Sequence, residues 1–242
     1  MKQRKHKFSL GIKIASILSC LALISVGFAS WWIVKMPEAV TEDGSFTVYA
    51  VEEKNVEFNN VVLSNPEIVF GKVDGVTETW LWAKDIAAEN LKSTLTFDVD
   101  LKDGNTLSTT SKLSEMLEKV TLTVEPSAAA ALEAAINANY IKNPTVSYTY
   151  TPAGGEEQTG NAFYNDTSDK IEIAIPMTAA TVNHVTVTVE IAFEWGSAFD
   201  NKNPYEYYNE KDYDATAFTA LTALNNLTGA TYDVTIAAVA KR

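Results

Sequence analysis

The sequence contains one cysteine, Cys20, and two histidines, His6 and His184, among its 242 residues. The chain after residue 34 therefore has no thiol and a single imidazole. No intrachain disulfide can form, and a cysteine metal centre or a thiol nucleophile is excluded from this part. A metal site built on imidazoles needs more than one histidine. We therefore predict neither a metal site nor a cofactor.

Positive charge is also scarce, and it is unevenly distributed. Of the 19 lysines and arginines, six lie within residues 1–35, which contain no acidic residue, whereas all 31 aspartates and glutamates follow. The formal net charge of the whole chain is −12. Such an acidic surface repels phosphate backbones, so we exclude nucleic acid as a partner. An acidic body suits a soluble extracellular surface.

Catalytic motifs are missing as well. The chain has no glycine-rich phosphate loop, no G-x-S-x-G and no H-E-x-x-H. His184 opens a predicted strand, where we expect a surface position and no catalytic role. Glu190 and Glu194 share one strand face, but at about 3.3 Å per residue their Cα atoms are about 13 Å apart. Glycosidase carboxyl pairs are roughly 5 to 9.5 Å apart. We therefore predict a protein that is not an enzyme.

The first 34 residues have the order of an export signal: a basic start, a long apolar run and then small residues. Residues 14–34 carry no charge, and this length also suffices to span a bilayer. Two interpretations stay open, a cleaved signal peptide and a retained membrane anchor. In either case the basic residues stay inside and the body lies outside. Cys20, in "ILSC", adds lipidation as a third.

The end of this segment, "VGFASWWIV", resembles leaders processed by the SipW-type signal peptidase. Gly27, Ala29, Ser30 and Trp31 match those leaders, and Trp32 stands where they usually have a small residue before the cut. Such leaders belong to TasA and camelysin-like proteins, which are secreted, β-rich subunits of fibres and biofilm matrix. The resemblance implies secretion and implies copies of the chain, or related matrix subunits, as partners.

Period-two alternation of apolar and polar residues recurs along the rest of the chain and predicts strands. One dry and one wet face per strand is typical of antiparallel sheets that pack together. The fold class that we predict is mainly β, an antiparallel, jelly-roll-like β-sandwich. The predicted strands are residues 45–51, 55–63, 77–83, 94–101, 119–124, 145–150, 170–176, 184–195 and 231–240.

Two stretches follow a helical period instead, residues 126–141 and residues 214–229, and we predict two short helices inserted between strands. We expect an exposed loop at residues 152–161. The domain organisation that follows is a signal peptide or anchor at residues 1–34, a linker at 35–44 and an extracellular sandwich at 45–242.

An aromatic stretch at residues 194–214 follows the longest predicted strand, and we expect a loop there. Its rings either close one end of the sandwich or form an exposed platform for a glycan or peptide. Asp200, Asn201 and Asn203 also suggest calcium, but Lys202 occupies the third position of that loop pattern. The aromatic residues are Trp195, Phe199, Tyr205, Tyr207, Tyr208 and Tyr213.

The function that we predict is a non-enzymatic, secreted or cell-surface structural protein, a subunit of a fibre or biofilm matrix. The alternative is a membrane-anchored surface module that binds a glycan or host protein through residues 195–213. The resemblance implies donor-strand exchange between subunits. In the predicted strand at 45–51, Phe46, Val48 and Ala50 would form either the donated strand or, as we favour, the first strand of the chain's own sheet.

Overall fold

The computed structural model describes residues 46–51, 55–70, 86–211, 215–227 and 230–241. The chain divides into two compact units, Met1–Lys35 and Met36–Arg242, and every described residue belongs to the second. Several predictions lie outside the described residues: the leader, the linker, the strand at 77–83, and the leader processing residues Ala29, Ser30, Trp31 and Trp32.

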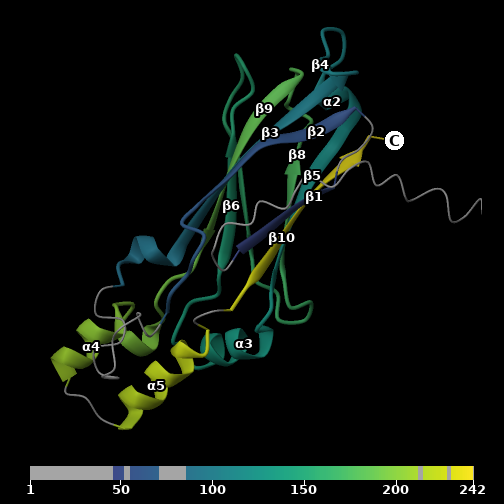
Figure 1. Ribbon diagram of the computed structural model, residues 1–242. Helices are drawn as coiled ribbons and strands as arrows, with labels where there is room; N and C mark the ends of the chain where they lie inside the picture. The colour runs from purple at the N-terminus through teal and green to yellow at the C-terminus, as the bar shows by residue number, and fades with distance from the viewer. Residues whose placement is uncertain (1–45, 52–54, 71–85, 212–214, 228–229, 242) are drawn as a thin grey trace, which may run out of the picture. The chain divides into compact units, whose positions relative to one another are not determined.

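The protein is mainly β and its strands form two sheets (Figure 1), as the alternation predicts. The four-stranded sheet has the order β1 (Phe46–Val51), β10 (Tyr232–Ala240), β5 (Leu117–Pro126), β8 (Ile171–Pro176). The larger sheet has the order β2 (Val56–Ser64), β3 (Lys92–Asp103), β9 (His184–Ala192), β6 (Thr145–Tyr150), β7 (Gln158–Phe163), and β4 (Thr106–Leu107) pairs with β3.

The alternating residues place one apolar face of each sheet in a common core. On β3 the side chains of Leu95, Phe97 and Val99 are fully buried, and β9 alternates in the same way. One continuous cluster of buried side chains contains residues of both sheets. The Tyr150 hydroxyl of β6 donates a hydrogen bond of 2.6 Å to the carbonyl oxygen of Pro176 on β8, so polar contacts also join the two sheets.

The first strand departs from the predicted antiparallel arrangement. β1 runs parallel to β10, with Phe46 opposite Tyr232, whereas the other named strand pairs are antiparallel. Alternation indicates which face of a strand is buried but carries no information about the direction of its neighbour. The prediction of a wholly antiparallel sheet is therefore wrong at this edge.

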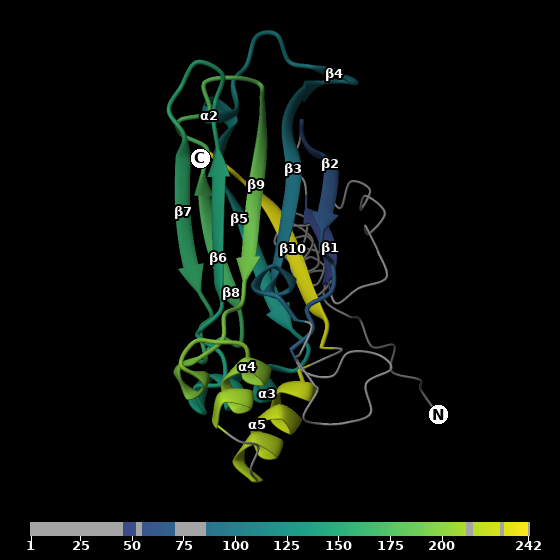
Figure 2. The same cartoon turned by 90° about the vertical axis from the view of Figure 1, so that its left-hand side faces the viewer.

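Helices gather at one end of the sheets (Figure 2). These are α3 (Ala129–Asn137), α4 (Pro204–Lys211) and α5 (Ala215–Asn225), whereas α2 (Leu113–Met116) lies at the other end. The short η2 (Ala88–Leu91) precedes β3, and η3 (Ser197–Phe199) precedes α4. α3 and α5 confirm the two predicted helices with shorter bounds, and α2 and α4 are additional.

Two predicted loops contain regular structure. The stretch at 152–161 ends in β7, which begins at Gln158 and pairs with β6 from Tyr150↔Gln158 to Thr145↔Phe163. Every residue of β7, "QTGNAF", is half-buried or exposed. The strand therefore has no buried apolar face, and alternation of apolar and polar residues could not reveal it. The aromatic stretch at 194–214 likewise contains η3 and α4.

Candidate functional site

The aromatic residues of the 194–214 stretch mostly face the protein. Trp195, Phe199 and Tyr208 are buried, and Tyr205 and Tyr207 are half-buried. Phe199 lies at the centre: its ring stacks on Tyr140 at 5.5 Å and makes edge contacts with Tyr207 and Tyr208. Tyr213 lies outside the described residues. This arrangement is that of a cap at the end of the sheets, with little ring area left for an external platform.

A close backbone approach anchors this aromatic cap. A Cβ atom added to Gly196 would stand 2.0 Å from the carbonyl oxygen of Asn139, just after α3. The Gly196 amide donates to the Tyr140 carbonyl at 2.9 Å, and the Ala198 amide donates to the Asn139 carbonyl at 3.0 Å. Only glycine allows the two chain segments to pack this closely.

The polar residues of the same stretch serve the turn and the start of α4. Asp200 and Asn201 both adopt left-handed backbone angles, with φ of 53° and 61°. The Asn203 side chain accepts a hydrogen bond from the Tyr205 amide at 2.8 Å and donates one to the Ile86 carbonyl at 2.6 Å. Pro204 follows at the first helical position, where its missing N–H costs nothing. These contacts favour a structural role over calcium binding.

The predicted donor residues lie in β1 of the chain's own sheet. Phe46 and Val48 are buried, and Ala50 is half-buried against the core. The Phe46 ring stacks on Tyr232 with centroids 5.0 Å apart.

The structure brings His184 into a carboxylate network that the sequence did not reveal. Its Nδ1 lies 2.6 Å from Oδ1 of Asp100, and Asn59 donates to the other oxygen of Asp100 at 2.8 Å. Asp100 and His184 are opposite residues of β3 and β9, 84 positions apart in the chain. The nearby Thr186 hydroxyl donates to Asp98 at 2.6 Å, so it is not oriented toward the imidazole as a nucleophile.

The two glutamates that we considered for glycosidase chemistry have separate partners. Glu190 pairs with Lys92 at 3.1 Å and Glu194 pairs with Lys142 at 2.6 Å. Each pair joins different segments across the sheet surface or its end.

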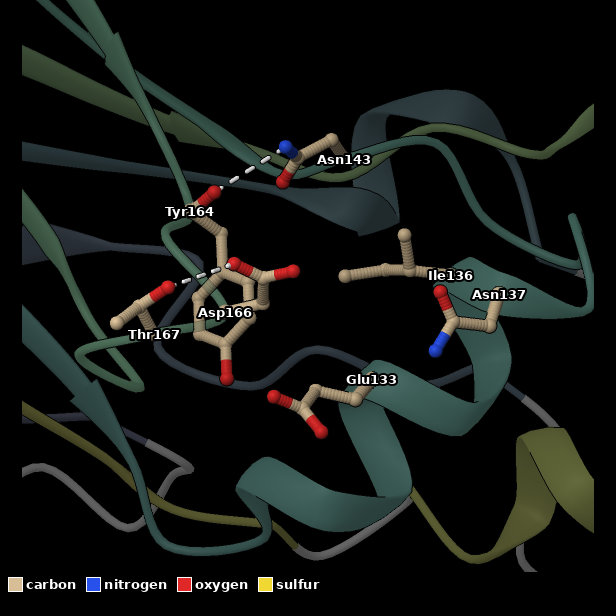
Figure 3. Close-up of a pocket in the computed structure, with 7 residues that line it drawn as sticks. All are labelled: Glu133, Ile136, Asn137, Asn143, Tyr164, Asp166 and Thr167. Carbon is tan, nitrogen blue, oxygen red and sulfur yellow. Dashed lines mark hydrogen bonds between the residues drawn. The ribbon is translucent and has the colours of Figure 1, made fainter.

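A polar cavity with a volume of about 350 Å³ lies between α3 and the turn that joins β7 to β8 (Figure 3). Sequence patterns gave no sign of it, because its walls come from three separate segments. Its lining residues are Glu133, Ile136, Asn137, Asn143, Tyr164, Asp166 and Thr167.

Hydrogen bonds fix the walls of this cavity. Asn143 donates to the Tyr164 carbonyl at 3.1 Å, and the Tyr164 amide donates to the Pro144 carbonyl at 3.0 Å. The Asn165 side chain accepts from the amides of Thr167 and Ser168 at 2.9 and 3.2 Å, which closes the turn on itself. The carbonyl of Lys170 accepts from the Asn165 amide at 2.9 Å. The turn therefore has a defined shape at the cavity mouth.

The pKa of Tyr164 depends on the negative charges around this cavity. Its hydroxyl donates to Oδ1 of Asp169 at 3.3 Å. Burial raises the pKa of Tyr164 to about 12, with further contributions from the charge and hydrogen bond of Asp169 and from the charges of Glu133 and Asp166. These three carboxylates are therefore close enough to the phenol to disfavour its ionisation. The cavity is a region of negative potential.

A second hollow, of about 430 Å³, lies beside His184 on the outer side of the larger sheet. It is more open than the first, and its polar lining consists mainly of threonines. Those lining it on β6 and β9 include Thr149, Thr186 and Thr188. Its hydroxyls give it hydrogen-bonding capacity but contribute no charge.

Fold and site together define a mainly β protein whose described residues form two sheets, an aromatic cap and an acidic cavity. Comparisons with protein-family models, with curated proteins and with solved structures found no match. The described ranges contain no group of three or more histidine, cysteine, aspartate or glutamate side chains that could hold a metal ion. The same part of the chain contains no helix with the length and apolar character needed to cross a bilayer.

Proposed function

We propose that the chain is a non-enzymatic structural protein, secreted or held at the cell surface, and that it forms a subunit of a fibre or biofilm matrix. Its partners would be copies of itself or related matrix subunits. The observation that supports this best is the position of β1. It is one of the two edge strands of the four-stranded sheet, and among the described strands it pairs only with β10.

The sequence of β1, "FTVYAV", contains no charge and no proline, and five of its six residues, all except Ala50, favour strands. An outer strand has a row of backbone N–H and C=O groups that can pair with another chain. Soluble proteins usually protect such an edge with lysine, proline or a bulge, and the pairing of β1 with β10 is regular. An edge strand that, among the described residues, has none of these protective features suits a protein whose function is to associate.

The export-type leader supports the extracellular part of the proposal, since residues 1–34 have the basic, apolar and small-residue order. We also propose that the two sheets form a jelly-roll-like sandwich. With β2 and β4 set aside, the sheets read β1-β10-β5-β8 and β3-β9-β6-β7, which is the strand order of a jelly roll. The parallel direction of β1 is the departure from that plan.

Fractionation of the native host tests the proposal. We expect the protein in the high-mass extracellular fraction, with a mature N-terminus that mass spectrometry places after the apolar segment, or with that segment retained as an anchor. A protein found in the cytosol, or only as a soluble monomer in the medium, would contradict the proposal.

A surface binding module is the second candidate, and the cavity beside α3 favours it. The aromatic stretch no longer supports this alternative, since Trp195, Phe199 and Tyr208 are buried. The cavity instead has walls held by hydrogen bonds and several polar side chains that converge on it, so a small polar ligand would find several hydrogen-bond partners there.

A further inference from the structure

The cavity between α3 and the β7–β8 turn has a chemistry that selects among ligands. Two of its lining groups are carboxylates, Glu133 from α3 and Asp166 from the turn, and the side chains of both extend into the space between these elements (Figure 3). Among the described residues that line it there is no lysine or arginine. A ligand with a positive charge would therefore gain attraction that a neutral or anionic ligand would not.

The uncharged groups add hydrogen bonds around these carboxylates. Among the described lining residues, Asn137, Asn143 and Thr167 contribute amide and hydroxyl groups, and Ile136 contributes the aliphatic wall. The Thr167 hydroxyl donates to Oδ1 of Asp166 at 3.4 Å and can still accept a hydrogen bond. The Asn143 amide nitrogen already donates to the Tyr164 carbonyl, which leaves its side-chain oxygen as an acceptor. A ligand that matches this lining has several hydroxyl groups and little apolar surface.

We propose that this cavity binds a protonated amino sugar, with its ammonium group between the carboxylates of Glu133 and Asp166. The ring hydroxyls then meet the polar side chains of Asn137, Asn143 and Thr167. Tyr164, itself 5% exposed, forms the floor, and its hydroxyl, held by Asp169, contributes a further polar contact. The volume of about 350 Å³ lies at the small end of the range for ligand sites and suits one or two sugar rings.

Other cationic ligands fit the cavity less well. An alkyl amine such as a lysine side chain has no hydroxyl groups for the amides of Asn137 and Asn143, and it would find one aliphatic side chain for its stem. A metal ion is disfavoured, because no group of three or more ligating side chains occurs in the described part of the chain. The inference deepens the second candidate function and does not depend on fibre formation.

Calorimetric titration of the full chain with the β-1,4-linked disaccharide of glucosamine tests the proposal. The comparison ligands are the N-acetylated disaccharide, which keeps the hydroxyls but loses the charge, and putrescine, which keeps the charge but lacks the hydroxyls. Near-physiological salt screens long-range attraction to the acidic surface. We expect the glucosamine disaccharide to bind at least tenfold more tightly than either comparison ligand.

Two variants locate the site, and a third controls for total charge. Glu133→Gln and Asp166→Asn should each weaken binding of the glucosamine disaccharide about tenfold or more. Glu156→Gln, which removes one charge from the exposed β6–β7 loop, should leave it within twofold. Absence of binding, equal binding of the N-acetylated disaccharide or putrescine, or equal effects of the three substitutions would each overturn the proposal. None of these results depends on whether the protein polymerises.

Discussion

At the scale of single residues, contacts between distant segments determine the environment of each site residue. Gly196 illustrates this, because its backbone packs against Asn139 at the end of α3 with no room for a side chain. The pKa values of the buried tyrosines show the same dependence on the surroundings. Burial raises the pKa of Tyr150 to about 12, with the charge of Tyr148 as a smaller cause, and burial raises the pKa of Tyr232 further still.

We predict that Gly196→Ala destabilises the protein by about 3 kcal/mol or more, at the upper end of typical overpacking costs. The added methyl would stand 2.0 Å from a backbone oxygen, which cannot rotate away as a side chain could. Urea unfolding measures the loss. Gly155→Ala is the matched control, since its nearest contacts of 3.4 Å are ordinary ones. Equal stability of the two variants would show that the cap does not pack in this way.

A second residue-scale prediction concerns alkaline pH. The pKa of Tyr150 is raised above its ordinary value near 10, so its stabilising contribution is fully present below pH 10 and is lost as pH rises toward 12. Tyr150→Phe should cost about 1 kcal/mol at neutral pH, because the hydrogen bond to Pro176 is lost. The decline above pH 10 should then become shallower.

Urea unfolding at several pH values follows both effects. Tyr49→Phe serves as control, since Tyr49 is 39% exposed on the outer face of β1. A decline above pH 10 that is as steep in Tyr150→Phe as in the parent chain would contradict the assignment of this effect to Tyr150.

At the scale of secondary structure, the sequence predicted those elements whose own side chains alternate. β3, β6, β8, β9 and β10 lie within two or three residues of their predicted bounds, since each has a complete buried face. β7 was missed because its edge position buries no complete face, and its place depends on pairing with β6. α4 was missed because its three tyrosines and its one asparagine have weak helical preference. The rings of Tyr207 and Tyr208 pack against Phe199, a contact that the local sequence does not reveal.

The candidate site was predicted less well than the fold, for a related reason. The contact between His184 and Asp100 joins residues 84 positions apart, and the cavity joins α3 to a turn some thirty residues later. Neither produces a local motif. Such sites follow from strand register, which alternation alone does not determine between neighbours.

The element-scale prediction concerns β1. If this strand completes its own sheet in solution, Phe46→Ala should lower the free energy of unfolding of the monomer by about 3–5 kcal/mol. The reason is the loss of a buried ring that stacks on Tyr232. Tyr49→Ala, on the exposed side of the same strand, should cost about 1 kcal/mol or less. Equal, small effects of both substitutions would instead mean that β1 does not pack on its own subunit.

At the scale of the whole molecule, the proposal balances an associating edge against a strong negative charge. A formal net charge of −12 opposes the approach of like subunits. Salt screens this repulsion, because the Debye length falls from about 30 Å at 0.01 M to about 8 Å at 0.15 M ionic strength. Assembly should therefore increase with ionic strength over this range, whereas association through ion pairs would decrease.

The most direct test of the central claim is the mass of the mature protein by size-exclusion chromatography with light scattering, over a wide range of protein concentration at physiological salt. A fibre or matrix subunit should form high-mass species whose share rises with concentration. A single monomeric mass at every concentration would contradict the proposed structural function.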